Sequence, residues 1–103
     1  MRIGQVIGHL TLARAHESVK GFRWKIVVPM TENDLRAEQE HQEPNTKELN
    51  TEELVVYDDL SVGDGQRIAF SEGAEASMPF FPNPKPIDAY NAAILDWIEL
   101  PVE

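Results

Sequence analysis

The sequence predicts a mainly β protein: a small five-stranded, OB-like β-barrel with one short helical turn near the C-terminus. A length of 103 residues, 42% of them hydrophobic, supports a single domain over residues 1–103 with a modest core. Several short apolar runs are separated by turns rich in glycine and proline, which is typical of all-β folds. One run alternates apolar and polar side chains, as a half-buried strand does. Short strands in a chain of this length are commonly closed into a small barrel.

The first strand candidate covers residues 2–12. The parity of its apolar side chains changes near Gly4, and Gly8 interrupts the run again. Glycine inside a strand often marks a bulge or a sharp bend, which a barrel requires. We therefore expect this strand to be irregular.

The cleanest strand pattern is "FRWKIVVPM", residues 22–30. Apolar side chains recur at every second position, which predicts a half-buried strand: Phe22, Trp24, Ile26, Val28 and Met30. Arg23 and Lys25 share the opposite face, either solvated or in a salt-bridged contact with another chain. Pro29 has no N–H for a sheet ladder, so this end of the strand should lie at an edge or leave the sheet.

Residues 31–53 form an acidic segment, "TENDLRAEQEHQEPNTKELNTEE", which holds eight of the eighteen Asp and Glu residues. Its polarity and its lack of aromatic residues predict a solvated, mobile loop. Its first part, residues 32–40, can form a weak helical turn, which Pro44 would limit.

Two further strands are predicted at residues 54–57 and 66–71, on either side of Gly63-Asp64-Gly65. A dinucleotide-binding fingerprint places its glycines between a strand and a helix, whereas here a strand follows. The full G-x-G-x-x-G pattern and the P-loop Lys-Ser/Thr pair are absent. Asp-Gly is a hairpin signal because glycine accepts positive φ. We therefore expect a turn rather than a phosphate cradle.

The last third of the chain is a proline-rich loop followed by an ambiguous segment. In the loop, residues 71–86, Phe80 and Phe81 are either core residues or contacts to a partner. In "PIDAYNAAILDWIEL", residues 86–100, apolar spacings of three and four favour a helix. The alternative is a single turn over residues 86–91 and then a strand over residues 93–99.

Composition excludes several function classes. Nine Lys and Arg against eighteen Asp and Glu give a formal charge of −9, which argues against nucleic acid as the main partner. The absence of cysteine excludes disulfides and thiolate metal sites and fits a cytosolic protein. No apolar run is long enough for a membrane span, and no stretch resembles a cleavable leader, so we expect neither.

No catalytic constellation is visible in the sequence. The three histidines, His9, His16 and His41, lack metal-binding spacings such as H-x-x-x-H. There is no G-x-S-x-G nucleophile elbow, and the adjacent Asp58 and Asp59 would point to opposite faces of a strand. We therefore expect no enzyme, with no catalytic residues, no cofactor and no metal.

Three stretches, in order, resemble one protein family. "MRIGQVIGHLTLARAHESVKGFRWKIVVP" is similar to the family's opening strand, short loop and second strand. "VVYDDLSVGDGQRIAF" resembles its valine-rich strand, aspartate, glycine-rich turn and next strand. "PIDAYNAAILDWIEL" is similar to its closing Pro-Val-Asp-Ala-Ala signature followed by Ile-x-Asp. The family is the EutN/CcmL family of bacterial microcompartment vertex proteins.

The resemblance implies an OB-like barrel that forms a closed homopentamer. Such pentamers cap the vertices of a carboxysome or metabolosome shell in the bacterial cytoplasm. Hexameric shell proteins would be the partners, with no catalysis, nucleic acid or membrane involved. The resemblance also favours the second C-terminal alternative, a helical turn over residues 86–91 and a strand through Trp97.

A ring of five such chains would carry 5 × −9 = −45 formal charges, which calls for screening or basic contacts between subunits. The candidates for basic contacts are Arg14, Lys20, Arg23 and Lys25. The candidates for an apolar interface, where aromatic residues are favoured, are Phe80, Phe81 and Trp97. Each of these residues could equally serve the chain's own core or its solvated surface.

The family's glycine-rich loops lie near the ring axis, which gives candidate pore residues in two loops: Gly63, Asp64 and Gly65, and Gly73, Ala74 and Glu75. The family's Gly-Ser-Ser-Ala-Arg run is replaced here by Gly73-Ala74-Glu75-Ala76-Ser77, and Ser61 matches the first glycine of the family's turn. Glu75 would repeat five times around the axis, or it is an ordinary exposed acid.

Two other functions stay open. One is a small acidic OB-like module that binds an oligosaccharide, a nucleic acid or a protein partner. A nucleic-acid OB-fold needs aromatic residues interleaved with basic ones, and only "FRWK" offers that pattern. The other is a small enzyme, which lacks a catalytic constellation.

Overall fold

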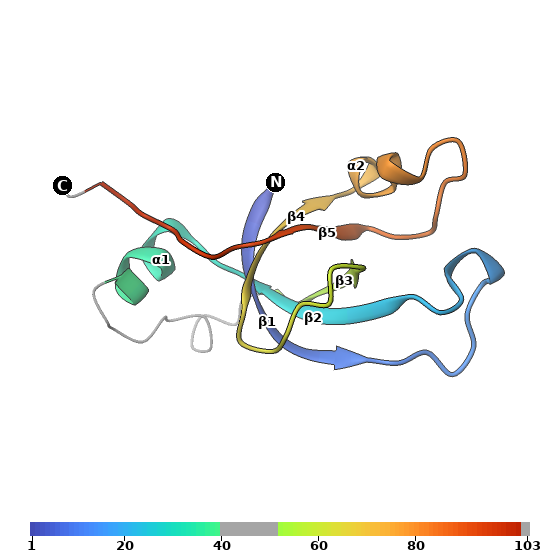
Figure 1. Ribbon diagram of the computed structural model, residues 1–103, viewed down its shortest axis with the longest axis horizontal. Helices are drawn as coiled ribbons and strands as arrows, with labels where there is room; N and C mark the ends of the chain where they lie inside the picture. The colour runs from blue at the N-terminus through green and yellow to red at the C-terminus, as the bar shows by residue number, and fades with distance from the viewer. Residues whose placement is uncertain (40–51, 102–103) are drawn as a thin grey trace.

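A computed structural model describes residues 1–39 and 52–101 of the chain. The described residues form a closed five-stranded barrel with the strand order β1-β2-β3-β5-β4 (Figure 1). The strands are β1 (Arg2–Leu10), β2 (Arg23–Pro29), β3 (Leu54–Asp58), β4 (Arg67–Glu72) and β5 (Ala89–Ile94). Neighbouring strands are antiparallel, except that β3 and β5 run parallel. The predicted fold class is confirmed.

Short helices occupy the connections: η1 (Glu17–Val19), α1 (Glu32–Gln39), α2 (Ala74–Ser77) and η3 (Met78–Phe80). α1 confirms the helical start predicted in the acidic segment. Thr31 and Asp34 cap it reciprocally, because the Thr31 N–H donates to the Asp34 carboxylate (2.9 Å) and the Asp34 N–H to the Thr31 hydroxyl (3.2 Å). The predicted loop beyond it, residues 40–51, lies outside the described residues.

The barrel interior holds one core cluster, with members from all five strands and from the loop before β4: Val6, Val27, Val56, Val62, Ile68, Phe70 and Ala89. Gly4 lies where β1 crosses this core, and a Cβ atom there would collide with the side chains of Val27 and Phe70. The predicted irregularity of β1 is confirmed, because the β1–β2 register shifts between Val6 and Gly8.

A second cluster covers the outside of the barrel at one end. Trp24 pairs with Tyr57 across β2 and β3, and Tyr57 pairs with Tyr90 of β5, so the three side chains form a row on the outer face. Phe22 and Phe80 pack over this row, with ring centroids 3.8 Å apart between Phe22 and Tyr57 and 5.4 Å apart between Phe80 and Tyr90. The barrel is therefore packed on both faces here.

The alternation predicted for β2 is present, but the barrel core lies on the other face. Val27, two residues after Lys25 and therefore on the face that Arg23 and Lys25 share in the predicted strand, is fully buried in the interior. Trp24 is buried on the outer face, under the second cluster. As expected, Pro29 lies beyond the last β2 residue that pairs with β3.

The turn at Gly63-Asp64-Gly65 is confirmed, but the hairpin that it predicted is wrong. Gly65 has φ = 86°, as a turn glycine does. Its N–H donates to the Val6 carbonyl at 2.7 Å, so the chain crosses to β1. β3 therefore pairs with β2 and β5, whereas β4 pairs with β1 and β5.

The C-terminal segment forms a strand, as the resemblance implied, and not the helix that the apolar spacing favoured, but the expected bounds are wrong. Residues 86–91 do not form a helical turn, and β5 ends at Ile94 instead of reaching Trp97. The reason is that Ala89 faces the core and Asn91 is buried, which requires the two-residue period of a strand. The helical turns occur earlier, in α2 and η3, within the stretch predicted as loop.

Candidate subunit interface

A buried carboxylate fixes the loop between β3 and β4. Asp58 is fully buried and accepts hydrogen bonds from the backbone N–H of Leu60 (3.0 Å), from that of Val62 (2.9 Å) and from the Asn91 amide (2.9 Å). Charged acceptors make strong hydrogen bonds of this kind. Asp59 is exposed and accepts a hydrogen bond from the Tyr90 hydroxyl at 2.8 Å. The two aspartates thus serve the structure separately.

Two phenols in the outer aromatic cluster are held in their protonated form. Burial raises the pKa of Tyr90 to about 12, with help from its hydrogen bond to Asp59. Burial, followed by the charge of Asp59, also raises the pKa of Tyr57. Both hydroxyls therefore stay neutral at physiological pH.

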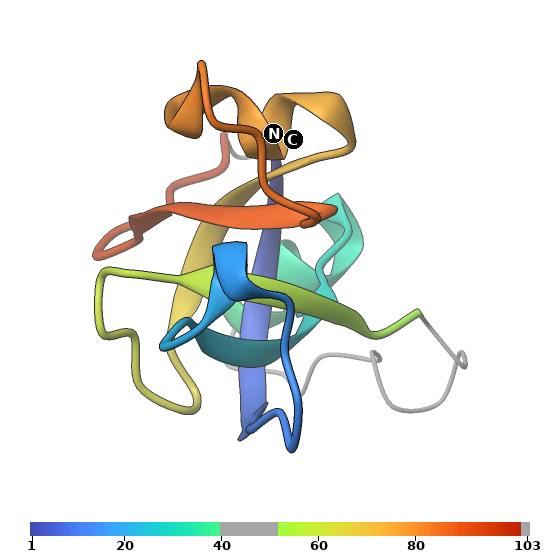
Figure 2. The same cartoon turned by 90° about the vertical axis from the view of Figure 1, so that its right-hand side faces the viewer.

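Two long connections lie together at one end of the barrel, which Figure 2 shows face on. Residues 11–22 join β1 to β2, and residues 73–88 join β4 to β5. The Lys85 ammonium lies 5.8 Å from the centre of the Phe22 ring and links the two connections. Four candidate basic residues lie at or beside this end, in the first connection and at the start of β2: Arg14, Lys20, Arg23 and Lys25.

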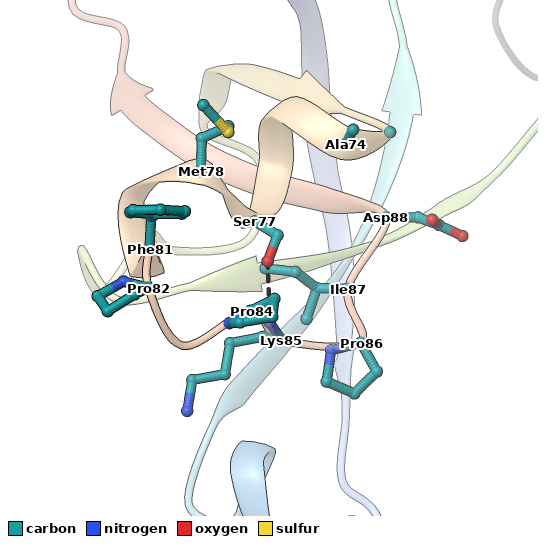
Figure 3. A pocket seen from close by; sticks show the side chains of 11 residues that line it. Ala74, Ser77, Met78, Phe81, Pro82, Pro84, Lys85, Pro86, Ile87 and Asp88 are labelled. Atoms are coloured by element: carbon teal, nitrogen blue, oxygen red, sulfur yellow. Dashed lines mark hydrogen bonds between the residues drawn. The ribbon is translucent and has the colours of Figure 1, made fainter.

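An open apolar groove of about 900 Å³ lies beside α2 (Figure 3). Met78 and Phe81 are 65% and 78% exposed beside it. The proline-rich chain forms one wall of the groove, and the Lys85 N–H fixes this wall by donating to the Ser77 hydroxyl at 2.8 Å. Phe80 and Phe81 therefore differ: Phe80 packs in the outer cluster, whereas the ring of Phe81 is exposed.

A second hollow, of about 580 Å³, lies in the first connection. We call it the loop hollow; the residues that matter for it are Leu12, Arg14, Val19, Lys20, Phe22 and Trp24. It combines apolar side chains with two exposed cations at its rim. The sequence pattern showed the cations but gave no sign that they border an apolar hollow.

The two candidate pore loops lie far apart. Residues 63–65 precede β4 and residues 73–75 follow it, so the length of the strand, about 20 Å, separates them. Figure 2 shows the connection from β3 to β4 and the connection from β4 to β5 on opposite sides of the barrel. Glu75 is exposed in α2, and Ser61 of the first loop has φ = 63° and accepts a hydrogen bond from Arg23 at 2.6 Å.

Trp97 lies at the opposite end of the molecule, on the extended tail of residues 95–101 (Figure 1). The tail is fixed to α1: Arg36 donates to the Pro101 carbonyl (2.9 Å), and the Gln39 side chain bonds both backbone groups of Leu100 (3.0 and 3.3 Å). The indole itself is 80% exposed. The structure therefore does not bring Trp97 together with the other candidate interface residues of the same chain.

Among the described residues, no group of three His, Asp or Glu side chains is arranged to hold a metal ion. The described helices are also too short and too polar to cross a membrane.

The sequence profile of the family described as ethanolamine utilisation protein EutN/carboxysome matches residues 1–96. The chain belongs to the EutN/CcmL family. The pentameric microcompartment shell protein GrpN from Rhodospirillum rubrum is 26% identical to this EutN/CcmL protein, with a TM-score of 0.72 over 97% of this chain and 99% of GrpN.

Two further structures share the barrel fold. CcmL from Gloeobacter violaceus superposes with a TM-score of 0.75 at 21% identity, over 97% of this chain and 90% of that one. EutN from Escherichia coli superposes with a TM-score of 0.71 at 16% identity, over 97% of this chain and 89% of that one. No curated protein sequence matches the chain.

Proposed function

We propose that this EutN/CcmL protein is a structural shell protein, a homopentamer that caps the vertices of a bacterial microcompartment in the cytoplasm. The observation that carries the proposal is the family match over residues 1–96, together with the similarity to the pentameric shell protein GrpN over nearly the full length of both chains. Its partners in the shell would be hexameric shell proteins, with no nucleic acid or membrane involved.

The exposed apolar side chains support an assembly role. Phe81 and Met78 lie beside the groove at α2 (Figure 3), whereas Trp97 is on the tail of residues 95–101, which runs beside α1 at the opposite end of the molecule (Figure 1). A ring needs two different patches on each subunit, which meet head to tail. We assign no catalytic step, because the hydrogen bonds of the buried Asp58 and Asn91 side chains go to main-chain groups and to each other.

The ring axis is proposed to run near α2, where Gly73, Ala74 and Glu75 are exposed. Five Glu75 carboxylates would then surround a narrow opening, where like charges repel each other and attract cations. A Glu75→Gln pentamer should therefore assemble with a weaker dependence on divalent cations than the wild type. Equal dependence, at equal stability, would argue against Glu75 near the axis. The loop at Gly63, Asp64 and Gly65 remains the other axis candidate.

The native mass of the purified chain tests the proposal most directly. A chain of 11.6 kDa should give a pentamer of 5 × 11.6 = 58 kDa by native mass spectrometry or light scattering. A monomer at every concentration tested would contradict the proposed function and return attention to a small acidic binding module.

Co-expression with hexameric shell proteins tests the vertex role separately. Hexagons alone tile a flat sheet, so closed polyhedral shells should form only when this chain supplies five-fold units. Open sheets or tubes in its presence, from a chain that is itself pentameric, would contradict the vertex role and leave the ring intact.

A further inference from the structure

The cations of the described residues fall into two groups. Four of them form ion pairs with carboxylates of the same chain: Arg2 with Glu52 and Glu72, Lys20 with Glu17, Arg36 with Glu32, and Arg67 with Glu38. At the end that carries the long connections, four cations lie more than 4.0 Å from every carboxylate of the described residues: Arg14, Arg23, Lys25 and Lys85. This end therefore offers positive charge that the chain itself does not neutralise.

The tail offers the opposite charge around a large apolar side chain. Trp97 is 80% exposed, and the nearby Asp96 and Glu99 are exposed as well. Because the bonds of Arg36 and Gln39 hold residues 100 and 101 against α1, the indole projects from a fixed segment rather than from a loose end. An ordered, exposed tryptophan between two acids is well suited to fill a cation-rimmed apolar hollow.

Two hollows could receive the Trp97 indole, both at the end of the molecule that carries the long connections. The groove beside α2 carries one cation, Lys85, and one acid, Asp88, so it would repel the acids of the tail as much as attract them. The loop hollow carries Arg14 and Lys20 and no acid among its lining residues. Lys20 pairs with Glu17 at 3.0 Å, but because this pair is exposed it contributes little, and it leaves the Lys20 ammonium open to a second acid. Its volume of about 580 Å³ is ample for an indole, since pockets for larger ligands span roughly 300–1,000 Å³.

We propose that the tail of one chain docks on a second copy of this chain, with Trp97 in the loop hollow and with Asp96 and Glu99 facing Arg14 and Lys20. The contact rests on the proposed pentamer and names its two patches. The patches lie at opposite ends of a molecule 47 Å long, so the contact joins neighbours rather than closing within one chain (Figure 1). Such head-to-tail contacts build rings when the rotation per subunit closes.

The roles of the two parts of the contact differ. Burial of the indole supplies most of the affinity, because buried tryptophans are common hot spots of interfaces. The exposed ion pairs at the rim contribute less affinity and select the orientation and the partner hollow. The contact should therefore tolerate exchange of the charges between its two sides, but not loss of the indole.

A charge-exchange experiment tests the pairing. Arg14→Glu with Lys20→Glu, and Asp96→Lys with Glu99→Lys, should each raise the concentration at which the ring dissociates about tenfold. The four changes together should restore it to within about threefold of the wild type. Trp97→Ala should raise this concentration about a hundredfold. The matched control is Val55→Ala, which truncates an exposed side chain that lines neither hollow and should leave the concentration within about twofold of the wild type.

Cysteine cross-linking gives an independent readout, because the chain contains no cysteine. Trp97→Cys with Leu12→Cys should form disulfides between subunits under mild oxidation, whereas each single variant and the pair Trp97→Cys with Phe81→Cys should not. Circular dichroism and thermal melting show that each variant is folded. If the wild type is a pentamer, the charge variants dissociate at the same concentration as the wild type, and cross-links form only through the Phe81 position, then this contact is overturned and the proposed function stands. A wild-type chain that never leaves the monomer overturns both.

Discussion

Asp58 is the residue on which the loop before β4 depends most. Replacing Asp58 with alanine leaves three donors without their acceptor, two of them buried, so the free energy of unfolding should fall by about 3 kcal/mol. Urea denaturation of the purified variant measures this loss. The control is Asp64→Ala at the exposed turn, which should change stability by less than about 0.5 kcal/mol. Similar losses in both variants would contradict the role of the network.

Tyr90 makes stability depend on alkaline pH. Its pKa is raised to about 12 in the folded chain, so the unfolded chain, with an ordinary phenol near 10, loses the proton first. Its contribution is therefore complete below pH 10 and is lost as the pH rises from about 10 to about 12. Denaturation midpoints measured across this range should fall more steeply for the wild type than for Tyr90→Phe. Parallel curves would contradict the assignment.

At the scale of elements, the adjacent residues Phe80 and Phe81 should differ in what they contribute to stability, because only Phe80 is packed. Phe80 packs on Phe22, Tyr57 and Tyr90, so Phe80→Ala should lower the free energy of unfolding by about 2–3 kcal/mol. Phe81 is 78% exposed, and Phe81→Ala should change it by less than about 0.5 kcal/mol. Thermal melting of the two variants at equal concentration measures the difference. The reverse order would mean that Phe81 covers the aromatic cluster.

The sequence predicted the elements best where a strand is regular. The bounds of β2, β3 and β4 agree to within one residue at each end because alternation and turn residues mark them. Alternation does not tell which face is inside when both faces are packed, as in β2. The residues of β5, Ala89–Ile94, suit a helix as well as a strand by pattern, and tertiary contacts favour the strand: Ala89 packs in the core, and the Asn91 amide donates to Asp58.

At the scale of the whole molecule, the net charge should govern assembly. Five chains carry −45 formal charges, which repel each other over tens of ångströms at low salt. Raising the ionic strength from about 10 mM to about 150 mM shortens the screening length from roughly 30 Å to roughly 8 Å. The ring should therefore become more resistant to dilution over this range, because ion pairs in direct contact are screened less. Light scattering across a dilution series measures it, and weaker assembly at higher salt would contradict the argument.

The candidate interface was only partly visible in the sequence. The exposure of Trp97 and Phe81 agrees with the predicted interface role, since aromatic residues are enriched in interfaces. The loop hollow could not be predicted, because Leu12, Val19 and Trp24 come together only when the first connection folds over the outer face. The pattern could not separate Phe80 from Phe81 either, since adjacent residues in a loop carry no periodicity.

The place of β5 in the barrel has a consequence for synthesis of the chain. β5 is the last of the five barrel strands along the chain, and it lies between β3 and β4 in the closed barrel. Until residues 89–94 leave the ribosome, the other strands can form only an open sheet, β4-β1-β2-β3, with bare edges at both sides. Bare edges invite pairing with other nascent chains. A chain stopped before Ala89 should therefore aggregate, whereas one stopped after Leu95 should remain folded, because sealing of the barrel is complete only at that point.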